Sequence, residues 1–259
     1  MRNYFIRFCN KIVRHTDWYN NIYWGGVSKF WRQNTFGLEV VNLGSGAGVN
    51  AFVYDQNVKG ANWALSPQSL LHDYDILKNY FSYIREGGYV FITLCPFSCL
   101  VSQYDKKHNF KYYTFLHPAT IQNFEDNERT RALQIKNNPL KEMPTYCIKQ
   151  TIKEILHTLK KRVFSEKKDL QLSAEQMMTG WKNQFGIKDL SEPISEQHLK
   201  ELISRRKTLD EMIEFCKERS LNPIIIYPPM FHTLSTLFPP QFRVNYIQNF
   251  LNGIEAQVL

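Results

Sequence analysis

Three short segments with the pattern of strands constrain the fold of this chain more than any other feature. They are Phe-Gly-Leu-Glu-Val-Val-Asn-Leu at 36–43, Tyr-Val-Phe-Ile-Thr-Leu at 89–94 and Ile-Ile-Ile-Tyr at 224–227. The second and third are continuous apolar runs, which are typical of strands that are buried on both faces of a parallel sheet. Between them, the apolar residues of 69–85 and 195–219 recur at helical spacing. The alternation of strands and helices predicts an α/β fold.

Shorter segments complete this prediction. A second strand is expected at 60–65 and a last helix at 243–251, while 256–259 has the pattern of a strand just beginning. The region 100–185 is polar and mainly helical or irregular, so we expect an insertion rather than a separately folding domain. The sequence therefore predicts a single domain, residues 1–259, built as a three-layer sandwich around a central parallel sheet of flavodoxin-like type.

Composition limits the class of protein. With 22% charged and 14% aromatic residues, the chain has enough apolar surface to fold, which excludes a disordered protein. No apolar run approaches the roughly 18 residues that a membrane span requires. The N-terminal stretch 1–15 is basic, but it lacks the apolar core and cleavage site of a signal peptide. The five cysteines are odd in number and scattered, as a reducing compartment allows, so we expect a cytoplasmic protein.

The net charge of +8 raises the question of nucleic-acid binding. The densest basic run, Lys160-Lys161-Arg162, is most simply the solvated face of a helix. A nucleic-acid partner is therefore not expected, and the sequence leaves the oligomeric state open.

Chemistry in parallel sheets gathers at the carboxyl ends of the strands, which directs attention to the loop after the first strand. This loop, 42–48, reads Asn-Leu-Gly-Ser-Gly-Ala-Gly. One hypothesis is nucleotide binding, because glycines before a helix expose backbone amides. The sequence of this loop resembles the first motif of S-adenosylmethionine-dependent methyltransferases. A ribose, however, needs an acidic residue about 20 positions later, where the chain has Asn62.

The second hypothesis makes Ser45 a nucleophile. A serine in a strand-to-helix turn can expose its hydroxyl, while its own N–H and that of Gly46 face a developing oxyanion.

A wider set of segments favours this second hypothesis. The segments Val-Val-Asn-Leu-Gly-Ser at 40–45, Gly-Ala-Asn-Trp-Ala-Leu-Ser at 60–66 and Tyr-Asp-Ile-Leu-Lys at 74–78 are followed by Gly87-Gly88 and by Pro-Phe-Ser at 96–98. Together they resemble the SGNH/GDSL hydrolase superfamily, and more narrowly the SGNH-like proteins often associated with bacterial surface-polysaccharide gene sets. The resemblance covers about 36–100 and, less distinctly, 195–251.

The resemblance implies a serine esterase or acyltransferase that acts on an O-acylated substrate, a small molecule or a carbohydrate, and that needs no cofactor or metal. Ser45 matches the nucleophile of the family, and Asn62 matches the asparagine of its second block. In two other blocks the chain departs from the pattern. Pro67 stands at the oxyanion glycine and has no N–H to donate, and Phe97, with Ser98 beside it, stands at the asparagine donor.

The last block of the family, an Asp and a His three residues apart, is not found. It follows the fifth strand in the family, and this chain stops where that strand begins, so we expect a truncated C-terminus. His232, just past the strand at 224–227, is then the candidate base. His72 with Asp73 and Asp75 is a weaker candidate, because acids at the start of a helix favour its dipole in any case.

A non-enzymatic function stays open beside these hypotheses. The scaffold with an incomplete catalytic set would then serve as a binding or assembly protein. Three further clusters have simple structural interpretations. Cys95 and Cys99 form a buried apolar pair rather than a zinc site. The aromatic residues between 18 and 31 are more consistent with core packing than with sugar stacking. Tyr112 and Tyr113, near Lys106, Lys107 and Lys111, line an acidic-glycan groove only as a minority interpretation.

Overall fold

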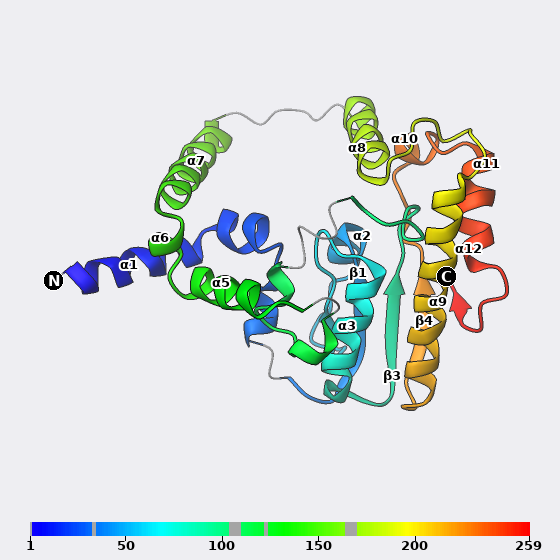
Figure 1. The fold of residues 1–259 in the computed structure, drawn as a ribbon, viewed down its shortest axis with the longest axis horizontal. Helices are drawn as coiled ribbons and strands as arrows, with labels where there is room; N and C mark the ends of the chain where they lie inside the picture. Colours follow the sequence, from blue (N-terminus) through cyan, green and yellow to red (C-terminus); the bar gives the residue numbers. More distant parts are fainter. Residues whose placement is uncertain (1, 33–34, 104–109, 122–123, 164–169) are drawn as a thin grey trace. The chain divides into compact units, whose positions relative to one another are not determined.

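The structure is a computed structural model that describes residues 2–32, 35–103, 110–121, 124–163 and 170–259 (Figure 1). The chain divides into two compact units. Met1–Asn34 and His108–Lys167 form the first, which we call the helical unit, and Thr35–Lys107 and Lys168–Leu259 form the second, the sheet unit.

These boundaries differ from the insertion expected at 100–185. The first 34 residues belong with the inserted segment, because aromatic rings from both pack together: Trp24 stacks on Phe110, with ring centroids 5.3 Å apart. The helix α8 (Leu170–Phe185) instead belongs to the sheet unit, where Phe185 stacks on Phe97 at 5.1 Å.

In its described residues, the sheet unit contains five parallel strands. They are β1 (Leu38–Gly44), β2 (Gly60–Asn62), β3 (Ile84–Thr93), β4 (Asn222–Ile226) and β5 (Gln257–Val258). Their order across the sheet is β2-β1-β3-β4-β5, which is the flavodoxin-like order. The predicted α/β fold with a parallel central sheet is therefore confirmed, including the short strand near the end of the printed sequence.

Helices cover the sheet on both faces. Right-handed crossovers place the helix between β1 and β2 on one face and those that lead to β3 and β4 on the other. Accordingly, α3 and α9 pack against each other, and α9 packs on β4. The helices of this unit are α2 (Gly46–Ala51), α3 (Leu70–Tyr80), α8, α9 (Glu196–Lys217), α10 (His232–Ser235), α11 (Pro240–Phe242), the π-helix η5 (Arg243–Gln248) and α12 (Asn249–Leu251).

The end of α3 and the start of β3 differ from the sequence expectation. The helix ends at Tyr80 rather than at position 85, a 3-10 turn Phe81–Tyr83 follows, and β3 begins at Ile84. The pairing with β1 then shifts, from Leu38 opposite Ile84 to Val40 opposite Tyr89. Gly87, with φ +71°, lies in the extra length and donates its N–H to the Ser220 carbonyl at 2.8 Å. The Gly87-Gly88 pair thus lies in an irregular part of β3, after the helix has ended.

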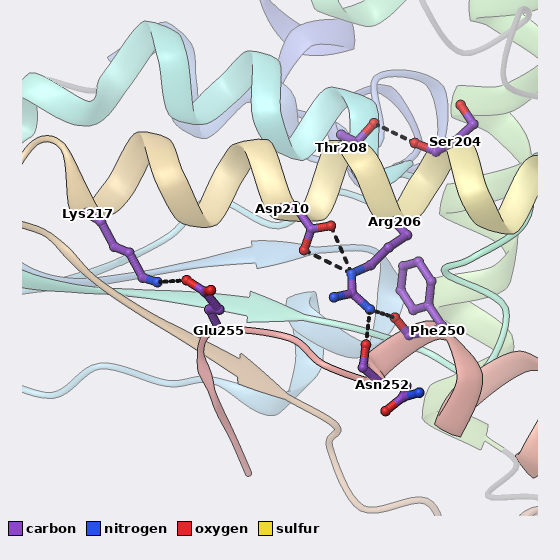
Figure 2. A network of polar contacts seen from close by, with 8 residues as sticks. All are labelled: Ser204, Arg206, Thr208, Asp210, Lys217, Phe250, Asn252 and Glu255. Atoms are coloured by element: carbon purple, nitrogen blue, oxygen red, sulfur yellow. Dashed lines mark hydrogen bonds and ion pairs between the residues drawn. The ribbon is translucent and has the colours of Figure 1, made fainter.

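A charged network on α9 fixes the segment that leads to β5 (Figure 2). Arg206 Nε donates to both carboxylate oxygens of Asp210, at 2.9 and 3.0 Å. Its Nη1 donates to the carbonyls of Phe250, at 3.0 Å, and Asn252, at 2.6 Å, at the end of α12. Lys217 adds an ion pair with Glu255 at 3.1 Å. Because a guanidinium offers several donors in a fixed plane, Arg206 satisfies helix-end carbonyls that would otherwise lack partners.

The helical unit is built around aromatic residues. Trp18, Tyr19, Trp24 and Phe30 are at most 5% exposed, which confirms that they are core. Its elements are α1 (Arg2–His15), η1 (Trp18–Tyr23), η2 (Val27–Arg32), η4 (Pro118–Thr120), α5 (Asp126–Asn137), α6 (Pro139–Glu142) and α7 (Pro144–Val163).

Tyr112 and Tyr113 also lie in this core. They are 0% and 5% exposed, so they do not line an open glycan groove. Lys106 and Lys107 lie outside the described residues. Within the described ranges of both units, no helix is long and apolar enough to cross a bilayer.

We expect Arg206→Ala to lower the free energy of unfolding by about 1.5 to 3 kcal/mol, because hydrogen bonds to a charged group contribute that much. The measurement is urea unfolding followed by far-UV circular dichroism. Lys207→Ala is the matched control, since that side chain is 79% exposed and lies 3.8 Å from Glu211; its expected cost is below about 0.5 kcal/mol. Equal costs for the two variants would contradict the role of Arg206.

Candidate active site at the carboxyl edge of the sheet

The loops after β1 and β3 leave the sheet at a topological switch point. From β1 the chain crosses to β2 on one side, whereas from β3 it proceeds to β4 on the other. In doubly wound sheets, ligands bind at such a point, beyond the carboxyl ends of the strands. Ser45 directly follows β1, and Cys95 and Ser98 follow β3, so the residues of both loops lie at this edge of the sheet.

Ser45 occupies the N-cap position of α2, but its side chain does not cap the helix. Its Oγ instead accepts a hydrogen bond from the backbone N–H of Gln68, at 3.2 Å. A serine at an N-cap usually turns its oxygen to the first helical amides. Here the hydroxyl is directed to the loop after β2. Because its oxygen accepts this bond, its own proton is free to be donated to another group.

Asp73 connects the end of β1 to the loop after β2. It lies in the first turn of α3 and is 3% exposed. Its Oδ1 accepts from the backbone N–H of Gly44 at 2.8 Å and also from Nε2 of Gln68. The N-terminal end of a helix favours a carboxylate. This one residue therefore fixes the backbone immediately before Ser45 and the side chain of the residue that contacts the Ser45 hydroxyl.

The glycines of the loop allow close packing. Gly44 has φ +122°, and a Cβ there would lie 2.5 Å from the carbonyl oxygen of Thr93 on β3. A Cβ at Gly48 would lie 2.8 Å from the Leu43 carbonyl oxygen and 2.9 Å from the Ala64 side chain. Glycine is needed at both positions because β1 and α2 lie too close to their neighbours to leave room for a Cβ atom.

Asn62 fixes the other side of the loop. Its Nδ2 donates to the carbonyls of Gly48 and Val49, both at 3.1 Å, and its Oδ1 accepts from Asn42 at 3.1 Å. A carboxylate at this position would face the carbonyl oxygens and repel them. An acidic residue that binds a ribose hydroxyl therefore does not fit at position 62. The amide is positioned as a structural support, and its oxyanion role stays a prediction.

The loop after β3 brings a thiol and a hydroxyl to the same edge. Ser98 Oγ accepts from the Cys95 N–H at 2.8 Å and donates to Cys95 Sγ at 3.5 Å. Burial raises the pKa of the Cys95 thiol, and the charge of Asp73 raises it further. Burial also raises the pKa of Tyr227, at the end of β4, well above its usual value. The neutral thiol is a poor nucleophile.

Two buried polar atoms at this edge have no hydrogen-bond partner within the described part of the chain. They are Oγ1 of Thr93, a residue that is 3% exposed, and Oε1 of Gln68. Thr93 lies beside Gly44, and Gln68 contacts Ser45 and Asp73. Because leaving a buried polar atom unpaired costs free energy, such atoms often mark a place for a ligand or water. The pattern of the sequence did not reveal either residue.

The two histidines considered as bases lie on elements other than the loop that carries Ser45. His232 is exposed, begins α10 and follows β4, which β3 separates from β1. His72 lies on α3 with Nδ1 2.8 Å from the Ser69 hydroxyl. Within the described residues, no histidine hydrogen-bonds to Ser45 Oγ. Hydrogen bonds thus join Ser45 to Gln68 and Gln68 to Asp73. In the part of the chain that the structure describes, none joins His232 to Ser45, and the role of His232 as the base stays a prediction.

Comparisons with family models, with curated proteins and with solved structures found no match to this chain.

Replacing Gly44 with Ala should lower the free energy of unfolding by about 3 kcal/mol or more. The new Cβ would combine a strained positive φ with a clash against the backbone of β3. Gly180→Ala is the control, because Gly180 lies in α8 with nothing within 4 Å of its Cβ position. That change should raise stability by up to about 1 kcal/mol. Urea unfolding of both variants measures the difference, and a Gly44 variant as stable as the parent protein would refute the close approach.

Proposed function

We propose that this protein is a serine-dependent esterase or acyltransferase of SGNH type, with Ser45 as the residue that carries the acyl group. The observation that supports this most directly is the Ser45 hydroxyl, which is diverted from helix capping and held at the switch point by Gln68. Proteins depart from local rules of this kind mainly at functional sites.

The proposed chemistry is acyl transfer in two steps. Ser45 Oγ attacks the acyl carbon of an O-acylated small molecule or glycan, and its proton passes to a base. The N–H groups of Ser45 and Gly46, with Ser98 and Asn62 on the neighbouring loops, are the proposed oxyanion and substrate contacts. The alcohol leaves, and water or a second alcohol then takes the acyl group from Ser45. No cofactor enters these steps.

A second candidate function is ligand binding without catalysis on the same scaffold. It is supported by the unpaired Thr93 Oγ1 and Gln68 Oε1 at the carboxyl edge of the sheet, and by the lack of a histidine hydrogen-bonded to Ser45 within the described chain. Pro67, which has no N–H, stands where an oxyanion donor is expected.

The methyltransferase alternative has less support. The Rossmann order places two strands beyond β1 on the β2 side, whereas this sheet has one. The strand end at Asn62 also offers an amide bound to carbonyls rather than a carboxylate for a ribose. A cytoplasmic location is proposed as well, and it fits the five cysteines, all of which are free thiols.

We expect a fluorophosphonate probe to label the intact chain at Ser45, and Ser45→Ala to abolish this labelling. Mass spectrometry of the modified peptide identifies the site. Ser204→Ala is the matched control, because Ser204 is an exposed serine on α9; it should label like the parent protein. A folded parent protein that stays unlabelled would contradict the esterase proposal and favour the binding scaffold.

His232→Ala should change the labelling rate of Ser45 by less than about threefold, a difference below 1 kcal/mol, because no hydrogen bond joins these two described residues. The rate is measured from the time course of probe incorporation. A loss of about a hundredfold or more would instead identify His232 as the base and require movement of α10 toward β1.

A further inference from the structure

The positive charge of the protein is concentrated in one of its two units. The helical unit carries 17 Lys and Arg against 7 Asp and Glu, whereas the sheet unit carries 15 against 17. The whole positive excess therefore belongs to residues 1–34 and 108–167. This uneven division of charge is not evident along the sequence, because the helical unit is assembled from two separate segments.

Helix α1 combines this charge with an exposed apolar row. It contains four Arg and Lys and no Asp or Glu. Asn10 and Val13 are 2% and 5% exposed and hold the helix to its unit; Asn10 Oδ1 accepts from the Leu140 N–H at 2.9 Å. On the opposite side are Tyr4, Phe8 and Ile12, which are 78%, 62% and 46% exposed.

The spacing places the apolar and basic residues side by side. Residues four apart lie on one helical row, so Tyr4, Phe8 and Ile12 form a continuous strip. Arg7 and Lys11, both exposed, form the adjacent row. An apolar strip with basic side chains along its edge is the pattern of a helix that lies in a membrane interface. The apolar side chains enter the acyl boundary while the long basic side chains reach lipid phosphates.

A second helix of the same unit repeats the combination. On α7, four apolar side chains are each between 52% and 56% exposed: Ile148, Ile152, Ile155 and Leu156. Lys149 and Lys153 follow the first two of them in sequence. Exposed apolar residues in helical rows, rather than scattered singly, indicate an interaction surface.

We propose that the helical unit binds the surface of an anionic lipid bilayer, with α1 lying in the interface and its Tyr4-Phe8-Ile12 strip inserted. Lipid accounts for both features of α1, because the bilayer takes up the apolar strip and the anionic headgroups attract the basic row. A nucleic acid would engage the basic row and leave the strip in water. The proposal does not depend on the acyl-transfer chemistry of the sheet unit.

The test is co-sedimentation of the full chain with vesicles of phosphatidylcholine and phosphatidylglycerol at 7:3, compared with phosphatidylcholine alone. We expect binding to the anionic vesicles that weakens with salt and is at least tenfold lower on the neutral ones. The double variant Arg7→Gln/Lys11→Gln should lower the partition coefficient about 30-fold, since each basic side chain near an anionic surface contributes about fivefold. Tyr4→Gln/Phe8→Gln should lower it at least tenfold, through the lost apolar burial.

Matched controls come from α9 in the sheet unit. Ile203→Gln replaces a side chain that is 61% exposed, and Lys200→Gln/Lys207→Gln removes two exposed charges; both should bind like the parent protein. Circular dichroism checks that the α1 variants, which alter exposed side chains, remain folded. The proposal is overturned if folded protein ignores anionic vesicles, or if both α1 variants bind like the controls. Binding to RNA that Arg7→Gln/Lys11→Gln abolishes and Tyr4→Gln/Phe8→Gln preserves, without vesicle binding, would identify a nucleic-acid surface instead.

Discussion

The candidate site depends on one buried carboxylate. Asp73 accepts hydrogen bonds from the Gly44 backbone and the Gln68 side chain, and Gln68 in turn donates its backbone N–H to Ser45. The end of β1 and the loop after β2, which the sheet order brings to one edge, are thereby joined to α3 in a single arrangement. An acid at the start of α3 would have a simple explanation in the helix dipole, yet this one is buried and reaches across to β1. The hydrogen bonds of Asp73 therefore help to hold the glycine-containing loop and the Ser45 hydroxyl in one arrangement.

Much of the fold could be predicted from the sequence, because buried parallel strands are continuous apolar runs. The segments at 36–43, 89–94 and 224–227 all contain strands, and even the two-residue β5 was expected. The unit boundaries were not predictable in the same way. The helical unit is held by contacts between distant segments, such as Trp24 with Phe110, and no local pattern reveals such contacts.

The site was partly predictable. Ser45 stood out because a serine between glycines after a strand is rare by chance, whereas Gln68 and Thr93 carry no local signal. The oxyanion role of Asn62 stays a prediction; the structure shows its amide donating to the carbonyls of Gly48 and Val49 in α2. His232 follows β4, so its distance from Ser45 is set by strand order, which the sequence does not specify. The two units also differ in their properties: the neutral-to-acidic sheet unit contains the candidate site at Ser45, and the basic helical unit contains the exposed apolar strip of α1.

The most direct test of the central claim is the rate at which a fluorophosphonate labels Ser45 in Asp73→Ala, compared with Asp75→Ala. Asp75 is equally buried, at 2% against 3%, and pairs with Lys78 at 3.0 Å. If Asp73 positions the Ser45 loop, its replacement should lower the labelling rate at least about tenfold in protein that remains folded, which corresponds to about 1.4 kcal/mol, while Asp75→Ala changes the rate little. Equal labelling rates in the folded parent protein and the folded Asp73 variant would contradict the claim that Asp73 positions the Ser45 loop.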